Sequence, residues 1–374
     1  MKTAPALDVD GLLGDPRMRI IVCCGSGGVG KTTTAAALGL RAAELGRNVV
    51  VLTVDPARRL AQSMGLSELD NTPRPVVEYD NGGSLHAMML DMKRTFDEII
   101  EAHADPDRAR QILTNPFYQS LSSSFAGTQE YMAMEKLGQL GRSDEWDLIV
   151  VDTPPSRSAL DFLDAPERLG RFLDGRVLRL LVAPAKAGGR GAFKLLNVGI
   201  GMVTNIANKV IGAQVLKDIQ TFVSAFDAMF GGFRERAEQT YKLLQAPGTA
   251  FLVVAAPEKD ALREASYFVE RLAEERMPLA GLVVNRVHRS PAADLSGARS
   301  TAAAEDLDRR GGHEVAAAVL RLHADRMRVA TRERREQESF MSAHPTVPVA
   351  EVPAMPGDVH DLDGLREIGE RLAS

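Results

Sequence analysis

The sequence predicts an α/β fold: a doubly wound, mostly parallel sheet of about seven strands that carries a helical insertion subdomain. Several short apolar runs, among them IIVCC, VVVLTV and LIVVD, are nearly continuous, a pattern typical of strands buried on both faces of a parallel sheet. Segments with helical periodicity alternate with these runs, as the crossover connections between parallel strands require. The chain of 374 residues is long enough to bury such a core.

Seven runs are expected to form the strands, and in chain order they are residues 18–24, 48–54, 84–90, 147–152, 250–256, 280–286 and 347–352. Residues 33–45 and 260–275 have the apolar spacing of helices that pack on a sheet. Residues 299–340 are rich in charges of alternating sign, which predicts solvent-exposed helices.

Two long stretches between strands are expected to be helical insertions, at about residues 92–141 and 156–247. The second stretch separates the fourth predicted strand from the fifth, and a simple crossover needs far fewer residues. Within it, residues 196–210 and 215–233 place apolar side chains at helical spacing. These stripes are either ordinary core packing or the apolar face of a subdomain that binds a partner.

The composition is that of an ordinary globular protein, and its formal net charge of −5 gives no bulk reason to expect nucleic-acid binding. Cys23 and Cys24 are adjacent, which suits neither a disulfide framework nor a zinc site and favours a reducing cytoplasm. The first 16 residues lack the features of a signal peptide. No apolar run is long enough to span a membrane, so we expect a cytoplasmic protein without an integral membrane segment.

The stretch CCGSGGVGKTTT matches two glycine motifs at once. The six residues from Gly25 to Gly30 fit the dinucleotide fingerprint GxGxxG, while Gly25, Gly30, Lys31 and Thr32 fit the phosphate loop GxxxxGK[ST]. Asp55 lies near the distance at which a dinucleotide-binding fold needs an acidic residue, so spacing alone does not separate the two. Lys31 and Thr32 decide for the phosphate loop, because a dinucleotide loop has no use for a lysine and a hydroxyl aimed at phosphates and Mg²⁺.

A phosphate loop binds ATP or ADP mainly through its backbone. Its glycines let N–H groups surround the phosphate oxygens, and the N-terminus of the following helix adds its positive end. Lys31 neutralises charge on the β- and γ-phosphates, and the Thr32 hydroxyl binds Mg²⁺. The residues expected to contact the nucleotide here are Gly27, Gly28, Val29, Gly30, Lys31, Thr32 and Thr33.

Two carboxylates follow apolar strands. Asp152 ends DLIVVD and is expected to hold Mg²⁺ directly or through water, the alternative being a strand-end carboxylate without a role. Asp55 ends another strand in VDPAR, where it could orient or deprotonate an attacking water, the alternative being a helix cap. Lys31 and Asp55 are therefore the expected catalytic residues.

Four motifs in order, GSGGVGKTTT, VDPAR, VVDTPPSRSALDFL and VVNRV, resemble those of the deviant-Walker ATPases of the arsenical-pump and tail-anchored-protein-targeting family. The resemblance spans residues 18–371 and implies a P-loop ATPase domain over 17–374 after an N-terminal tail at 1–16. It also implies a dimer with a homologous subunit, either the same chain or a paralogue, that closes over ATP. In such a dimer the helical insertions form an apolar groove for the transmembrane segment of a client protein.

The resemblance also assigns roles to single residues. Asp55 corresponds to the aspartate that activates water, in the segment called switch I. Asp152 begins the segment called switch II, which reads DTPPSRSALD here. Asn285 corresponds to the asparagine that reads the adenine, and Arg286 stands beside it. Pro353 begins the segment where the family's adenine-side loop lies, so these three are expected to bind the nucleotide.

The chain departs from the family pattern at informative positions. Ser26 replaces the lysine that reaches across the dimer to the partner's ATP, and Arg58 replaces a histidine. The zinc-binding CxxC of the eukaryotic targeting factors and the metalloid-binding cysteines of the arsenite pump are absent, so arsenite transport is not expected.

Ser26 bears on the mechanism, since one cation near the γ-phosphate can be worth about 10³–10⁵ in rate. A homodimer would lack that cation at both sites and hydrolyse ATP slowly or not at all. A heterodimer with a lysine-bearing paralogue would regain it at the site in this chain. The alternative is that Arg58, or another basic residue, supplies the charge within the chain.

Two further functions remain open. One is a regulatory subunit that binds nucleotide with little turnover, which Ser26 favours. The other is a positioning ATPase of the MinD/ParA type, which would act on a membrane or on DNA. Its membrane-bound form needs a basic amphipathic C-terminal helix, whereas the last residues, DLDGLREIGERLAS, carry acidic side chains throughout and no lysine.

Overall fold

The computed structural model describes residues 4–54, 61, 63–66, 68–116, 118–119, 128–154, 232 and 235–374. Asp55, Arg58 and the apolar stripes at 196–233 lie outside the described residues. The chain divides into two compact units. The first comprises Met1–Met89, Ser143–Leu160 and Leu243–Ser374, and the second comprises Leu90–Arg142 and Asp161–Lys242.

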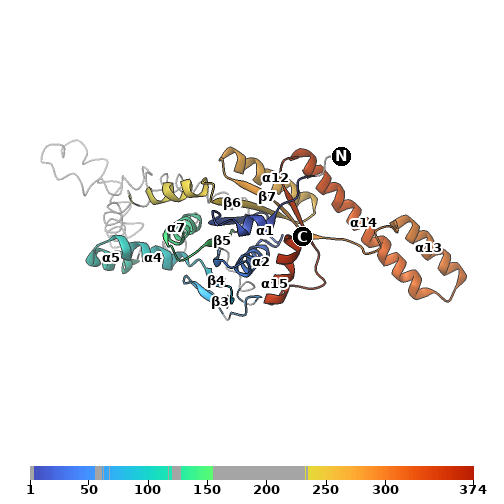
Figure 1. Ribbon diagram of the computed structural model, residues 1–374, viewed down its shortest axis with the longest axis horizontal. Coiled ribbons are helices and arrows are strands. Elements are labelled where there is room, and N and C mark those ends of the chain that lie inside the picture. The colour runs from blue at the N-terminus through green and yellow to red at the C-terminus, as the bar shows by residue number, and fades with distance from the viewer. Residues whose placement is uncertain are drawn as a thin grey trace, which may run out of the picture. The chain divides into compact units, whose positions relative to one another are not determined.

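The first unit is built on an eight-stranded sheet with the order β3-β4-β2-β5-β1-β6-β7-β8 (Figure 1). The strands are β1 Ile20–Cys24, β2 Asn48–Thr53, β3 Arg74–Glu78, β4 Ser84–Met89, β5 Leu148–Asp152, β6 Thr249–Ala255, β7 Leu279–Val287 and β8 Val349–Pro353. Every neighbouring pair is parallel except β3 with β4. The predicted doubly wound, mostly parallel fold is confirmed, and all seven expected strands form.

The eighth strand, β3, was not expected. Its sequence RPVVE is short and has a charged residue at each end, and the strand lies at the edge of the sheet with none of its residues fully buried. Pro75 within it cannot donate to a ladder, which is tolerated at an edge but masks the strand in the sequence. An edge strand pairs on one side only and therefore needs no continuous apolar run.

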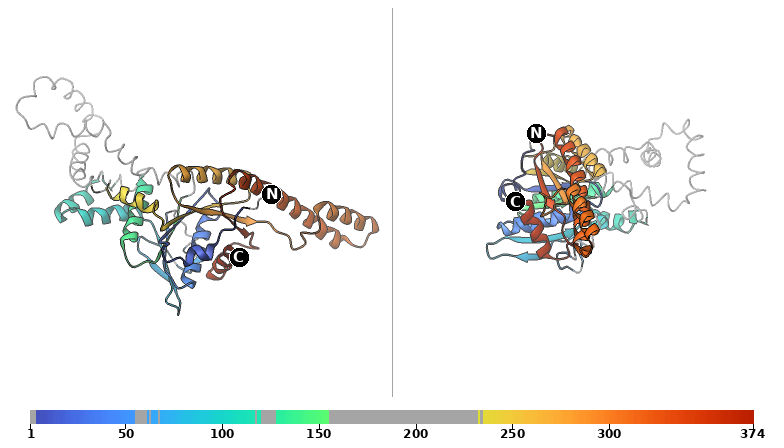
Figure 2. Two further views of the ribbon diagram at one scale, coloured as in Figure 1. Left: turned by 45° about the horizontal axis from the view of Figure 1, so that its top comes forward. Right: turned by 90° about the vertical axis from the view of Figure 1, so that its right-hand side faces the viewer.

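Helices cover both faces of the sheet (Figure 2). The central strands β1, β5 and β6 are therefore buried along their whole length. On one face lie α2, Lys31–Glu44, and α15, Leu362–Leu372. On the other face α12, Lys259–Glu274, packs across β6 and β7. The apolar side of α15 is buried against α2 and β8, so this acidic helix contributes to the core.

Residues 1–16 were expected to form an N-terminal tail. The described residues of this segment instead belong to the first compact unit and pack on it. Helix α1, Val9–Gly14, packs on α2 and buries Val9 and Leu13 at 1% and 0% exposure. The backbone N–H of Leu7 donates to the Val349 carbonyl oxygen at 3.1 Å. A helix of 6 residues is too short to show a periodicity, which is why the sequence did not reveal it.

The charge-rich segment forms two exposed helices, as predicted: α13, Gly297–Arg310, and α14, Glu314–Ala343. They meet through small buried side chains, including Ser300, Ala304 and Ala317. None of the helices in the part of the chain that the structure describes is long and apolar enough to cross a membrane.

The second unit is helical where it is described. It contains α4, Met92–His103, α5, Pro106–Leu113, and α7, Thr128–Arg142. Helix α4 packs on α7, and the Lys136 ammonium lies 2.7 Å from the Glu98 carboxylate between them. The interpretation of residues 92–141 and 156–247 as insertions stays a prediction.

Candidate nucleotide-binding site

The glycine-rich loop, residues 25–30, joins the C-terminal end of β1 to the start of α2. Strand β1 lies at the centre of the sheet between β5 and β6, and the chain leaves it for β2 on the far side of β5. Ligands of open α/β sheets bind outside the carboxyl ends of the strands at such a reversal of strand order. The loop therefore stands where this fold places a ligand.

The loop needs glycine at two positions for lack of space as well as for its dihedral angles. Gly25 has φ +149°, and a Cβ atom there would stand 2.1 Å from the Val254 carbonyl oxygen. Gly30 has φ +95°, and a Cβ atom there would stand 2.2 Å from Nδ2 of Asn285. The loop is wedged between the ends of β6 and β7, and only glycine permits so close an approach.

Helix α2 begins without a side-chain cap. Its N-cap residue is Gly30, whereas α4, α5 and α13 begin with Asp91, Asp105 and Ser296, whose side chains each accept a backbone N–H. The first N–H groups of a helix have no partner inside it and carry partial positive charge. An uncapped N-terminus after a glycine loop is a suitable anion site.

Lys31, the first residue of α2, is only 6% exposed, and its ammonium spans the loop to donate to the Ser26 carbonyl oxygen at 2.9 Å. Ser26 thus contributes its backbone to the site, and its side chain brings no positive charge. Burial and the Asp152 carboxylate raise the pKa of the neighbouring Cys23 thiol well above its ordinary value, and the Lys31 charge opposes this rise.

Asp152 and two threonines form a buried oxygen cluster. The Asp152 side chain has 0% exposure, and its Oδ2 accepts the Thr32 hydroxyl at 2.6 Å and the Thr53 hydroxyl at 2.9 Å. Thr32 comes from α2, Thr53 from the end of β2 and Asp152 from the end of β5. A carboxylate and hydroxyl oxygens are ligands that Mg²⁺ accepts, so these residues fit the expected metal.

Thr53 did not figure in the sequence prediction. It is a polar residue in the apolar run VVVLTV and has 0% exposure. A buried hydroxyl needs a partner, and that requirement is the signal that could have identified it. Thr153 behaves similarly, donating its hydroxyl to the Cys23 carbonyl oxygen at 2.8 Å.

The end of β7 also contacts the loop. The Asn285 Nδ2 atom donates to the Val29 carbonyl oxygen at 2.8 Å, and the Arg286 Nη1 atom donates to the Gly28 carbonyl oxygen at 2.9 Å. Asn285 was expected to read the adenine, and its amide is here engaged by the phosphate loop. Its contact with the base stays a prediction.

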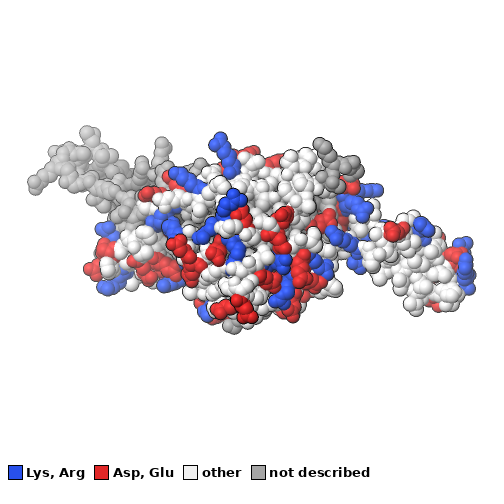
Figure 3. All heavy atoms as spheres, in the orientation of Figure 1, with Lys and Arg blue, Asp and Glu red and all other residues white. Residues whose placement is uncertain are grey.

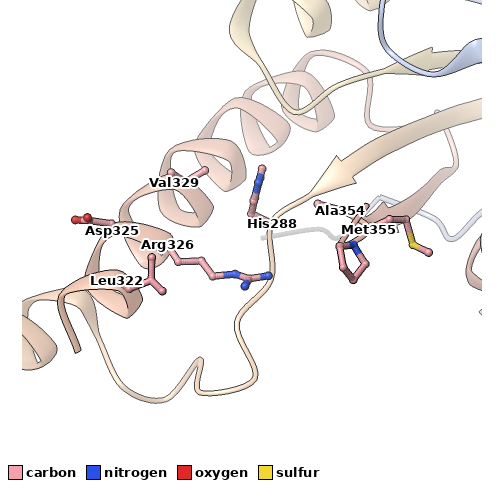
Figure 4. Close-up of a pocket in the computed structure, with 8 residues that line it drawn as sticks. His288, Leu322, Asp325, Arg326, Val329, Ala354 and Met355 are labelled. Atoms are coloured by element: carbon pink, nitrogen blue, oxygen red, sulfur yellow. The ribbon is translucent and has the colours of Figure 1, made fainter. Parts of the chain in front are cut away.

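Pro353 ends β8 and is paired with Val287 of β7, at the same edge of the sheet as Asn285. Beyond it Ala354, Met355 and Pro356 line a pocket of about 460 Å³ with residues of α14 (Figure 4). His288 also lines it, and its Nδ1 atom lies 2.7 Å from the buried Glu333 carboxylate. Arg326 reaches from α14 toward the loop after β7.

Most of the expected site residues that the structure describes therefore come together. Loop residues 25–30, Lys31, Thr32, Asp152, Asn285 and Arg286 are joined by contacts at one edge of the sheet. Pro353 shares that edge through the pairing of β7 with β8. On the face drawn in Figure 3, acidic and basic side chains are interspersed.

Comparison with known proteins extends this picture. Residues 18–307 match the family model described as anion-transporting ATPase. A protein named ATPase GET3 from Malassezia globosa is 31% identical over 162 residues, which are 43% of this chain and 46% of that protein. An ATPase ASNA1 homolog from Cryptosporidium parvum is 27% identical over 70% of this chain and 63% of its own length. ATPase get3 of Schizosaccharomyces pombe is 25% identical over 76% of this chain and 78% of its own length. The chain thus spans less than two thirds of the first two relatives.

Proposed function

Because the chain belongs to the anion-transporting ATPase family, we propose that it binds Mg-ATP at the glycine-rich loop and hydrolyses it. The observation that carries the proposal is the 2.6 Å contact of the Thr32 hydroxyl with the Asp152 carboxylate, next to a loop whose Ser26 carbonyl oxygen holds the ammonium of the buried Lys31. Lys31 and Thr32 come from the start of α2 and Asp152 from the end of β5, and together they would supply the metal ligands and the cation that phosphoryl transfer needs.

We propose a separate role for each group of residues at the site. The N–H groups of the loop and of the first turn of α2 bind phosphate oxygens, and Lys31 neutralises their charge. Thr32 and Asp152 would hold Mg²⁺, which when bound neutralises charge that develops on the phosphates. Asp55 is proposed to orient the attacking water, and Asn285, Arg286 and Pro353 to lie on the base side.

Ser26 suggests that two different subunits cooperate. By resemblance, a lysine at this position in one subunit completes the site of its partner, and serine carries no charge. We propose that a lysine-bearing paralogue, paired with this chain, supplies the cation to the site in this chain. Alternatively, Arg58 supplies it within the chain.

The proposed client is a hydrophobic protein segment, such as the transmembrane anchor of a tail-anchored protein. Support comes from the resemblance, from relatives named GET3 and ASNA1 ATPases, and from the apolar stripes of the sequence at residues 196–233. Nucleotide-driven closure of the dimer would expose or cover the groove for such a segment. Cys23 and Cys24 are buried and form no disulfide, which favours a reducing compartment such as the cytoplasm.

Calorimetric titration with Mg-ATP and measurement of phosphate release test the proposal. We expect the wild-type chain to bind Mg-ATP, and Lys31→Ala and Asp152→Asn to weaken binding or abolish turnover. Arg289→Ala is a matched control, because Arg289 pairs with Glu351 on the surface. Absence of binding by the wild-type chain, with or without Mg²⁺, would refute the proposal.

A regulatory subunit is the second candidate, and Ser26 favours it. Tight binding of ATP with negligible turnover, even beside a lysine-bearing paralogue, would select it. The MinD/ParA-type alternative is less favoured, since the apolar side of α15 is buried in the core rather than presented to a membrane.

A further inference from the structure

Two neighbouring side chains at the end of β7 hold two successive carbonyl groups of the glycine-rich loop. Asn285 holds the Val29 carbonyl at 2.8 Å and Arg286 holds the Gly28 carbonyl at 2.9 Å. The partners lie 256 and 258 positions apart in the chain, so only the fold brings them together.

Each of these hydrogen bonds fixes the direction of an N–H group. In a trans peptide unit the C=O and N–H bonds point to opposite sides. The Gly28 carbonyl shares its unit with the N–H of Val29, and the Val29 carbonyl shares its unit with the N–H of Gly30. Two carbonyls held toward β7 therefore leave two consecutive N–H groups directed away from it, as an anion-binding loop requires.

The local backbone is shaped for this contact. Arg286 has φ +65°, in the left-handed region that residues other than glycine rarely adopt, and the β7–β8 register shifts between Asn285 and Val287. A bulge of this kind re-aims a side chain, here toward the loop. The Asn285 Oδ1 atom accepts the Arg286 N–H at 3.0 Å, so the amide is fixed at both of its ends.

We propose that Asn285 and Arg286 are positioning residues that hold the phosphate loop in its anion-binding conformation through the carbonyls of Val29 and Gly28. The inference rests on the proposed function, because it takes a phosphate-bearing nucleotide as the ligand. It adds to that function by giving both residues a role on the phosphate side that does not depend on the base.

The test uses two probes, Mg-ATP and inorganic tripolyphosphate with Mg²⁺, because the second has no base. In Asn285→Ala and Arg286→Ala we expect the Kd of both probes to rise by about tenfold, the effect of losing one positioning hydrogen bond. Arg286→Lys keeps a cationic donor and is expected to recover part of the loss. If Asn285→Ala weakens ATP alone, Asn285 is a base reader and the proposal is overturned for it.

Hydrogen exchange of the loop provides a readout that needs no ligand. We expect residues 25–30 to exchange faster in both alanine variants while β1 keeps its protection, since the carbonyl anchors are lost locally. Arg289→Ala, three positions further on, is expected to change neither exchange nor binding. If the wild-type chain binds neither probe, the proposed function fails, and the exchange experiment still decides whether Asn285 and Arg286 order the loop. Wild-type exchange and wild-type Kd in both variants would overturn the inference.

Discussion

At the scale of single residues, the chemistry of the site depends on how one buried carboxylate is oriented. Asp152 accepts two hydroxyl groups on the same oxygen, Oδ2, from Thr32 and Thr53. Thr32 is expected to bind the metal itself. Thr53, at the end of β2, is expected to act on the metal only by orienting the Asp152 carboxylate. Residues that orient a metal ligand are often worth about 10- to 100-fold in metal affinity.

Thr53→Val therefore tests this orientation. The variant keeps the shape of the side chain and removes its hydroxyl, so we expect the Mg²⁺ concentration needed for half-maximal ATP binding to rise by about tenfold. Thr53→Ser keeps the hydroxyl and serves as the matched control. An unchanged Mg²⁺ dependence in Thr53→Val would show that Asp152 is oriented without this contact.

The two thiols next to the loop give a second prediction. Burial raises the pKa of the Cys24 thiol from 9.0 to about 12, against the opposing effect of the Lys31 charge. The folded state thus favours the protonated thiol. This contribution to stability is complete below pH 9 and is lost as the pH rises toward 12.

We expect neither thiol to react with a thiol-specific reagent at about pH 8 in the folded protein, and both to react after denaturation. The urea midpoint should fall as the pH is raised above 9, the ordinary pKa of the thiol. Replacing both residues by alanine should lessen that fall. Rapid labelling of the native protein would contradict the burial of these side chains.

At the scale of elements, the N-terminal helix α1 is part of the core of the first unit. Leu13 is fully buried, Asp10 of α1 pairs with Arg41 of α2 at 2.8 Å, and the Asp10 pKa is lowered by that contact. The Arg47 guanidinium donates to the carbonyl oxygen of Leu13 in α1 at 2.9 Å and to that of Met18 after α1 at 2.6 Å. The segment is thus attached by both apolar and polar contacts.

Leu13→Ala should lower the free energy of unfolding by about 2–5 kcal/mol, the usual cost of removing a fully buried leucine side chain. The neighbouring Leu12 is only partly buried, so Leu12→Ala is the control and should cost less. Urea denaturation of the two variants measures the difference. Equal and small losses would mean that α1 does not contribute to the stability of the core.

At the scale of the whole molecule, the open question is whether one chain suffices for catalysis. The Lys31 ammonium donates to the Ser26 carbonyl oxygen of the loop, and the Arg286 guanidinium donates to the Gly28 carbonyl oxygen from outside it. A further cation near the γ-phosphate would come either from the chain itself, through Arg58 or another basic residue, or from another subunit. The two possibilities differ in how turnover depends on the partner.

We expect Ser26→Lys to raise the kcat of the chain by at least about tenfold, a conservative share of what one cation contributes to phosphoryl transfer. The gain should grow with protein concentration, because the lysine acts on the partner's site. Ser26→Met, of similar length without the charge, is the control. Brisk turnover by the wild-type chain at low concentration, unchanged in Ser26→Lys, would point to a cation within the chain.

The sequence by itself determined the parallel sheet and the phosphate loop, because both are encoded in contiguous residues. The runs around β1 and β5 are apolar on both faces, and Lys31 with Thr32 distinguishes the loop from a dinucleotide fingerprint. The exposed helices α13 and α14 were predicted for the same reason, since their alternating charges are a local pattern.

Only the tertiary structure decided the features that depend on distant contacts. Thr53 meets Asp152 across 99 positions and Asn285 meets Val29 across 256, and no local pattern encodes either pair. Strand β3 and helix α1 escaped prediction because each is too short to show a period and is fixed by what it packs against. Local periodicity reports the burial of an element, whereas the direction in which a polar side chain points is set by the partner that the fold brings to it.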